Sequence, residues 1–104
     1  MAHDVFVSYP NVDKATADAV VNSLESSGIR CWVAPRDVPH GVDWAAAIVD
    51  AIDHSPMMVL VFSDGTNASD HILREVRAAG DADIPIVPFR TTQAEPNKAL
   101  KYYI

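Results

Sequence analysis

The sequence predicts one α/β domain built on a short, doubly wound parallel sheet. Runs typical of strands alternate with patterns typical of helices, and such alternation favours parallel strands joined by right-handed crossovers. The run at 57–62 is apolar at every position, as in a strand that helices cover on both faces. With 104 residues, 49% of them hydrophobic, the chain has the size and composition of one globular domain over residues 1–104.

The expected strands and helices alternate along the sequence and are joined mostly by short loops. The strands are β-branched or aromatic runs at 4–9, 29–33, 57–62 and 84–89. The helices, with their caps, are expected at 13–28, 43–54, 69–80 and 97–103. Asp13 and Asp43 are the expected N-caps of the first two helices, and Gly28 ends the first. Loops are expected at 34–43 and 63–69, and Pro85 and Pro88 favour a place near the sheet edge for the last strand.

Composition excludes several classes of function. Fourteen acidic and eight basic residues give a net charge of −6, which provides no broad surface for nucleic acid. The apolar run at 57–62 is too short to span a bilayer, so no membrane partner is expected. Cys31 is the single cysteine, so it can form neither an internal disulfide nor a thiolate zinc site, and a reducing, cytoplasmic location is expected. The four histidines lack paired metal-ligand spacing, so no metal is expected.

Ligands of such sheets bind outside the carboxyl ends of the strands. In this chain, three loops follow the carboxyl ends of strands and together form the rim of the expected ligand site; they begin at Ser8, Ala34 and Ser63. No glycine-rich dinucleotide or P-loop motif is present, and no nucleophile elbow of a serine hydrolase. A phosphate-accepting receiver domain would need carboxylates where Ser8 and Ser63 stand.

The predicted helix at 69–80 carries the most informative polar pair. The residues expected to face the sheet are Ile72, Val76 and Ala79, and those expected to face water are Asp70, Arg74 and Arg77. Glu75 falls on the border, with His71 one turn earlier on the same side. A half-buried carboxylate there could stabilise an electron-deficient centre. The alternative is a boundary residue that pairs with a neighbouring base.

Five segments together resemble a bacterial-type TIR (Toll/interleukin-1 receptor) domain. They are DVFVSY at 4–9, GIRCWVAPRDVPHGVDW at 28–44, the strand at 57–63, SDHILREV at 69–76 and IPIVPF at 84–89. The resemblance covers nearly the whole chain and is most specific at WVAPRD, with Gly41 and Trp44 at the expected distances. It implies a flavodoxin-like fold. The family usually continues into a fifth strand and a last helix, so a C-terminally truncated domain is expected.

For many members, the resemblance implies cleavage of NAD⁺ between nicotinamide and ribose, in immune or antiphage signalling. NAD⁺ is then a substrate, no other cofactor is implied, and the products are ADP-ribose or a cyclic ADP-ribose. Glu75 matches the catalytic glutamate of the family. The residues implied to border the nucleotide are Tyr9, Pro10, Asn11, Arg36, Asp37, Gly41, Trp44, Ser63 and His71. Self-association through the long loop is implied as well.

Two residues differ from the family pattern. His71 stands where many enzymatic members have tryptophan, and His40 stands where the long loop commonly has a second proline. These differences motivate an alternative, a non-catalytic module for TIR–TIR interaction. A second alternative is an enzyme like the nucleoside deoxyribosyltransferases, which share the topology and also use a carboxylate.

Three of the residues that the resemblance assigns to the site also have a purely structural alternative. Trp44 can equally anchor its helix in the core, and Arg36 and Asp37 can form an exposed ion pair.

Overall fold

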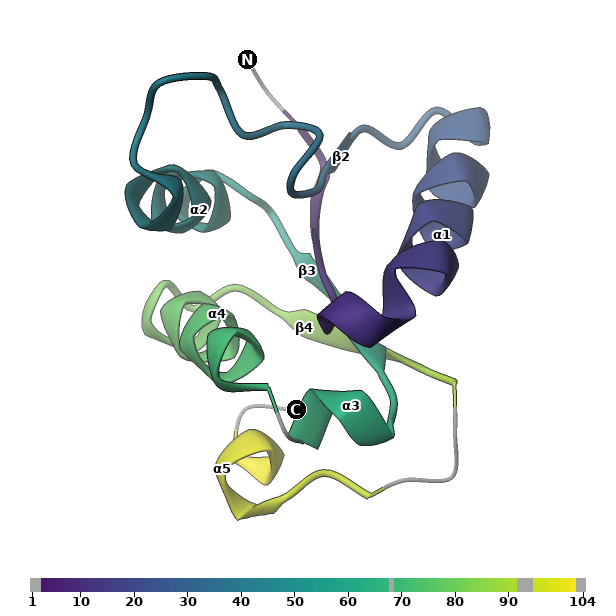
Figure 1. Cartoon of the computed structure of the whole chain (residues 1–104), viewed down its shortest axis with the longest axis vertical. Helices are drawn as coiled ribbons and strands as arrows, with labels where there is room; N and C mark the ends of the chain where they lie inside the picture. The colour runs from purple at the N-terminus through teal and green to yellow at the C-terminus, as the bar shows by residue number, and fades with distance from the viewer. Residues whose placement is uncertain (1–2, 68, 92–94, 103–104) are drawn as a thin grey trace.

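The structure is a computed structural model that describes residues 3–67, 69–91 and 95–102. Within these residues, four parallel strands form one sheet in the order β2-β1-β3-β4 (Figure 1). The strands are β1 (Val5–Ser8), β2 (Cys31–Trp32), β3 (Met58–Phe62) and β4 (Ile86–Arg90). The helices are the 3₁₀ turn η1 (Asn11–Asp13), α1 (Lys14–Ser26), α2 (Trp44–Asp53), α3 (Asp64–Asn67), α4 (Asp70–Asp81) and α5 (Lys98–Lys101). The predicted doubly wound parallel sheet is therefore confirmed.

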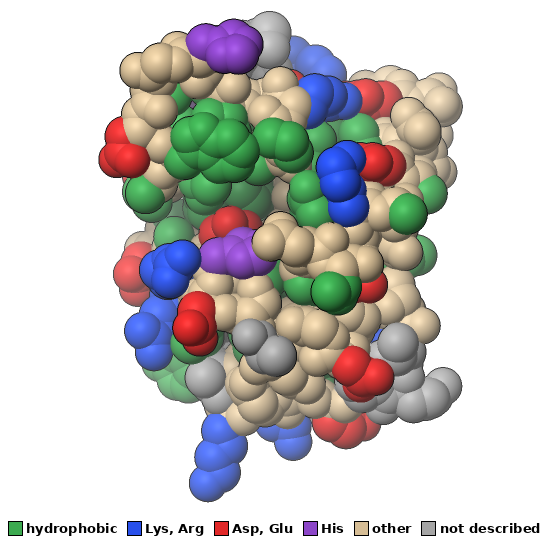
Figure 2. All heavy atoms as spheres, viewed as in Figure 1, with side chains coloured by type: hydrophobic (Ala, Val, Ile, Leu, Met, Phe, Trp, Pro, Cys, Tyr) green, Lys and Arg blue, Asp and Glu red, His purple; other side chains and the backbone are tan. Residues whose placement is uncertain are grey.

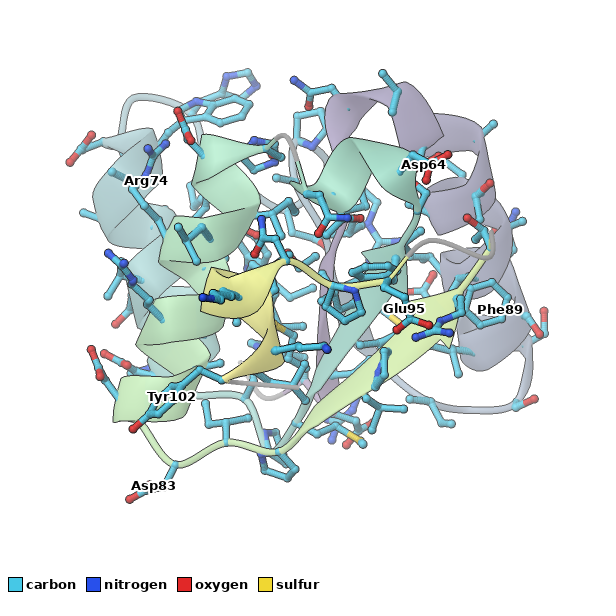
Figure 3. All side chains as sticks on the ribbon, turned by 90° about the horizontal axis from the view of Figure 1, so that it is seen from below. Asp64, Arg74, Asp83, Phe89, Glu95 and Tyr102 are labelled. Atoms are coloured by element: carbon cyan, nitrogen blue, oxygen red, sulfur yellow. The ribbon has the colours of Figure 1, made fainter. Side chains whose placement is uncertain are left out.

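Helices cover the sheet on two faces, and each face has its own apolar core (Figures 1 and 3). Val5 and Val7 of β1 pack with the buried residues of α1 on one face. Phe6 points to the other face and packs with buried residues of α2, α4 and α5. Because side chains alternate along a strand, Ser8 lies on the same face as Phe6. The alternation thus directs Ser8 toward α4.

The sheet changes its winding direction between β1 and β3. These two strands pair in parallel with Phe6 opposite Met58 and Ser8 opposite Leu60. The chain leaves β1 over one face through α1 and returns to β3 over the other face through α2 (Figure 1). Such a switch point is where ligands bind in open α/β sheets.

The predicted central, buried position of the third strand and the predicted edge position of the fourth are both confirmed. β3 is central and has four fully buried residues, as its continuous hydrophobicity predicted. β4 is one of the two edge strands of the described sheet, as its prolines predicted. On the α1 side no described helix covers β4, so Val87 and Phe89 remain 44% and 48% exposed (Figure 3).

The second strand is shorter than the predicted range of 29–33. The carboxylate of Asp37 accepts a hydrogen bond from the backbone N–H of Val33 at 2.9 Å, so the chain leaves the sheet there. At the other end, the carbonyl of Arg30 accepts bonds from the N–H groups of Asp4 and Val5. Only Cys31 and Trp32 remain in the ladder.

The segment 63–69 was predicted as a loop, but it contains the short helix α3. The hydroxyl of Thr66 accepts the N–H of Ser63 and donates to the carbonyl of Val61, which closes this turn without an apolar periodicity. Gly65 packs so closely on η1 that an added Cβ would lie 2.7 Å from Val12 Cγ2. The helix therefore depends on side-chain hydrogen bonds and a close approach that hydrophobic patterning does not report.

The helix ends agree with the predictions to within a few residues. Asp13 and Asp43 occupy the N-cap positions of α1 and α2, but neither side chain makes a capping bond. α4 continues to Asp81, one residue beyond the expected end. The helix predicted at 97–103 is α5, whose N-cap Asn97 accepts the N–H of Leu100, and position 103 lies outside the described residues. In the described segments, no helix combines the length and apolar character needed to cross a bilayer.

Candidate functional site

A pocket of about 500 Å³ opens at the carboxyl end of β1, between α2 and α4. Figure 2 shows it as a hollow with apolar side chains on one side and a histidine and acidic side chains on the other. The residues that line it are Phe6, Val7, Tyr9, Asn11, Lys14, Ala34, Pro35, Trp44, Ile48, His71 and Glu75. Its position agrees with the switch point of the sheet and with the predicted rim, except that no described residue of the third loop lines it.

The N-terminal turns of α4 bring His71 and Glu75 into this pocket. Ser69 caps the helix, because its hydroxyl accepts the N–H of Ile72. Ile72 and Val76 are fully buried against the sheet. Glu75 lies on the border of that apolar stripe, as helical spacing predicted, and it faces β1.

Among the residues that the structure describes, one side chain, that of Ser8, forms a hydrogen bond with the Glu75 carboxylate. Ser8 Oγ donates to Glu75 Oε1 at 2.8 Å. Burial raises the pKa of this carboxyl above its ordinary range, while the Ser8 bond and the positive potential of His71 and Arg74 act in the opposite direction. No cation lies within ion-pair distance of Glu75 in the part of the chain that the structure describes. The expected alternative, a boundary glutamate paired with a base, is thus wrong.

His71 ties the start of α4 to the end of β1. Its Nε2 lies 3.2 Å from the carbonyl oxygen of Tyr9, and its Nδ1 lies 3.0 Å from Ser69 Oγ. A carbonyl only accepts, so Nε2 carries a hydrogen and donates to Tyr9, while Nδ1 bonds with the Ser69 hydroxyl. Both ring nitrogens are therefore engaged in holding the site together.

Tyr9 connects the same region to the long loop. Its hydroxyl donates to the carbonyl oxygen of Ala34 at 2.7 Å, and burial raises the pKa of the phenol. Asn11 and Lys14 line the pocket from η1 and the start of α1. Lys14 Nζ also lies 3.0 Å from Asp18. The rim on this side is polar, whereas Ala34, Pro35 and the residues from α2 make the opposite wall apolar.

Trp44 lies at the mouth of the pocket and is 53% exposed. The alternative that it anchors its helix in the core is therefore wrong. Trp44 is the first residue of α2, whereas the buried residues of this helix, Ala51 and Ile52, lie in its second half. A large exposed aromatic ring beside a pocket is suited to stacking on a planar ligand.

Five residues expected to border the ligand lie outside the pocket lining: Pro10, Arg36, Asp37, Gly41 and Ser63. Arg36 makes a bidentate pair with Glu25, both contacts at 2.9 Å, and also pairs with Asp37. The pair between Arg36 and Glu25 lowers the pKa of the Glu25 carboxyl and anchors the long loop to the end of α1. Ser63 is buried, with its hydroxyl bonded to the carboxylate of Asp13.

Sequence reasoning missed the role of Ser8 as a partner of Glu75, and it missed Lys14 at the rim. The signal for Ser8 was a polar residue at the end of an otherwise apolar strand, on the strand's α4 face. The apolar wall residues carry no chemical signal, since each would fit a core equally well.

Comparison with known proteins places these features in a family. A model of the TIR domain matches residues 5–104. The TIR domain of the Toll-related receptor TRR-2 from Hydra magnipapillata is 24% identical, with a TM-score of 0.86 over 99% of this chain and 82% of that one. A metazoan TIR-STING receptor from C. gigas is 25% identical, with a TM-score of 0.80 over 97% of this chain. TIR domains of the activated Roq1 resistosome, which recognises the pathogen effector XopQ, are 23% identical with a TM-score of 0.75 over 86% of this chain.

The chain spans 36% of the TIR-STING receptor and 57% of the Roq1 chain. No curated protein sequence matched it. The agreement in topology extends over nearly all of the chain, and the flavodoxin-like α/β fold is common to it and the TIR structures. Because the family match covers all but the first four residues, the chain belongs to the TIR domain family.

Proposed function

We propose that this chain cleaves NAD⁺ at the bond between nicotinamide and ribose, in immune or antiphage signalling. The observation that carries the proposal is Glu75, a carboxylate that no cation of the described residues pairs with, in a pocket large enough for a nucleotide at the switch point of the sheet. The family includes enzymes of this kind, and the matched Roq1 assembly recognises a pathogen effector. A cytoplasmic location is part of the proposal.

The chemistry requires no acid, because the nicotinamide of NAD⁺ is already cationic. The carbon–nitrogen bond breaks with its electron pair going to the ring nitrogen, so neutral nicotinamide leaves and positive charge develops at ribose C1′. An ionised Glu75 stabilises that charge and accepts a bond from a ribose hydroxyl. Water then adds to C1′ and releases a proton, which gives ADP-ribose. Attack by an internal nucleophile instead gives a cyclic product.

The pocket walls suit the other parts of a dinucleotide. Lys14 is the permanent cation of the lining, and it lies on the polar rim, where it could hold the diphosphate. Trp44 and Pro35 form an apolar wall for a planar ring. His71 holds the first turn of α4 against Tyr9, which keeps Glu75 beside the carboxyl end of β1.

The test is an assay for free nicotinamide with the full chain at high protein concentration. Wild type should release nicotinamide from NAD⁺, and Glu75→Ala should abolish release while leaving the fold intact. Glu95→Ala is the matched control, since Glu95 is an exposed glutamate that does not line the pocket. Absence of release from wild type under all conditions would favour a non-catalytic interaction module. Base exchange between deoxynucleosides without loss of NAD⁺ would favour the deoxyribosyltransferase alternative.

We propose also that copies of this chain associate with one another through the long loop. Val42, near the end of this loop, and Trp44, which lines the pocket at the start of α2, are both about half exposed. A second copy that covers them would bury apolar area and exclude water from the site. Sedimentation velocity together with specific activity over a range of protein concentrations tests this. A monomer whose specific activity does not change with concentration would contradict it.

A further inference from the structure

Ser8 occupies an unusual place for a hydroxyl. It is the last residue of β1, it is 1% exposed, and it does not line the pocket. Its neighbours in the strand, Val5 to Val7, are apolar and buried. Within the described residues, its hydroxyl makes one side-chain hydrogen bond, to Glu75 Oε1 at 2.8 Å. A buried polar group at this position therefore serves one partner, and that partner is the carboxylate of the proposed site.

The second oxygen of Glu75 is in a different situation. Oε2 has no hydrogen-bond partner among the described residues. Yet the described chain has no buried side-chain oxygen or nitrogen that lacks a partner. Oε2 therefore keeps contact with the open space of the pocket that Glu75 lines. The two oxygens have separate roles: Oε1 is held by the protein, and Oε2 is presented to a ligand.

We infer that Ser8 is a positioning residue, which fixes the Glu75 carboxylate through Oε1 so that Oε2 faces the ribose of the substrate. The inference rests on the proposed function for the role of Glu75 and on the geometry for the role of Ser8. Because Ser8 does not reach the pocket, it acts on turnover through Glu75 and not through binding of the substrate.

The charges around Glu75 determine what loss of the Ser8 hydroxyl would do. On α4, the positive potential of His71 and Arg74 lowers the pKa of Glu75. Tyr9, directly after β1, and Lys14, at the start of α1, line the same pocket. None of these groups forms an ion pair with Glu75 in the described structure. Burial raises the pKa of Glu75, and the Ser8 bond opposes that rise. Without Ser8, ionisation of Glu75 therefore requires a higher pH.

The test compares Ser8→Ala with Ser55→Ala. Ser55 is also a buried serine, and its hydroxyl donates to the carbonyl of Ala51 and bonds to His3, outside the pocket lining. In Ser8→Ala we expect kcat for nicotinamide release to fall about tenfold to a hundredfold, the range expected when a bond to a charged group is lost. We expect KM to change little, and the acid limb of the pH profile to move to higher pH. Ser55→Ala should show none of these changes.

A second readout does not depend on catalysis. Titration of the Glu75 side-chain carbon by NMR, without substrate, should show the midpoint at higher pH in Ser8→Ala than in wild type and Ser55→Ala. An unchanged Glu75 titration in a folded Ser8→Ala protein would overturn the inference, whatever the activity. If no variant releases nicotinamide but the midpoint still moves, the proposed function fails while the hydrogen-bonding role of Ser8 stands. A lower kcat with an unmoved midpoint would also overturn the inference.

Discussion

Truncation of Ile72 to alanine tests whether α4 is held against the sheet as described. Ile72 is 0% exposed and lies three residues before Glu75, on the face of α4 that packs into the core. Ile72→Ala removes three carbon atoms, worth about 2.4 kcal/mol at roughly 0.8 kcal/mol for each buried methylene. The cavity left behind adds to this, and measured losses for such changes span about 2–5 kcal/mol. In a domain of this size, the melting temperature should fall by at least about 10 °C.

Thermal and urea unfolding followed by circular dichroism measure this loss. Val49→Ala is the control, because Val49 is 47% exposed on α2, belongs to neither apolar core and does not line the pocket, so its truncation should cost less than about 0.5 kcal/mol. An Ile72→Ala protein no less stable than Val49→Ala would show that α4 does not pack through this residue. The contact between Ser8 and Glu75 would then lose its structural basis, since it requires α4 to lie against β1.

Three further predictions concern the pocket. His71→Ala removes both bonds that join α4 to Tyr9 and Ser69, so the free energy of unfolding in urea should fall by about 1–2 kcal/mol, and nicotinamide release should fall with it. Lys14→Ala should raise KM for NAD⁺ about fivefold with kcat little changed in steady-state kinetics, because a contact at an open rim acts on binding; an unchanged KM would contradict the diphosphate assignment. Burial raises the folded-state pKa of Glu75 above its unfolded value of about 4.3, so the folded protein binds the proton more tightly, and stability falls as the pH rises from the unfolded value through the folded one. Glu75→Gln should remove this fall and make the protein more stable than wild type at neutral pH but not at low pH, which urea titrations at a series of pH values would show.

Periodicity predicted the main elements because each has a sufficient apolar pattern of its own. The strand at 57–62 was recognised from its continuous hydrophobicity, and its central position followed. The short helix α3 was not recognised, since it depends on Thr66 and on the close approach of Gly65 to Val12. Such contacts join segments that are distant in sequence, and no local pattern records them.

The candidate site was predictable in its centre and not at its edges. Helical spacing placed His71 and Glu75 on one side of α4, and both line the pocket. The family resemblance also pointed to Arg36, but the structure engages its guanidinium with Glu25 outside the pocket lining. The contact of Ser8 with Glu75 required knowledge of which face of β1 meets α4. That is a tertiary fact, which the strand pattern alone leaves open.

The measurement that tests the account most directly is the rate of nicotinamide release by Glu75→Gln relative to wild type. Glutamine retains an oxygen that can accept from Ser8, so the variant should fold and differ from wild type chiefly by one negative charge in the pocket. Loss of a charge that stabilises the transition state should lower the rate about a hundredfold or more. A folded Glu75→Gln protein that releases nicotinamide as fast as wild type would contradict the assignment of Glu75 as the catalytic residue.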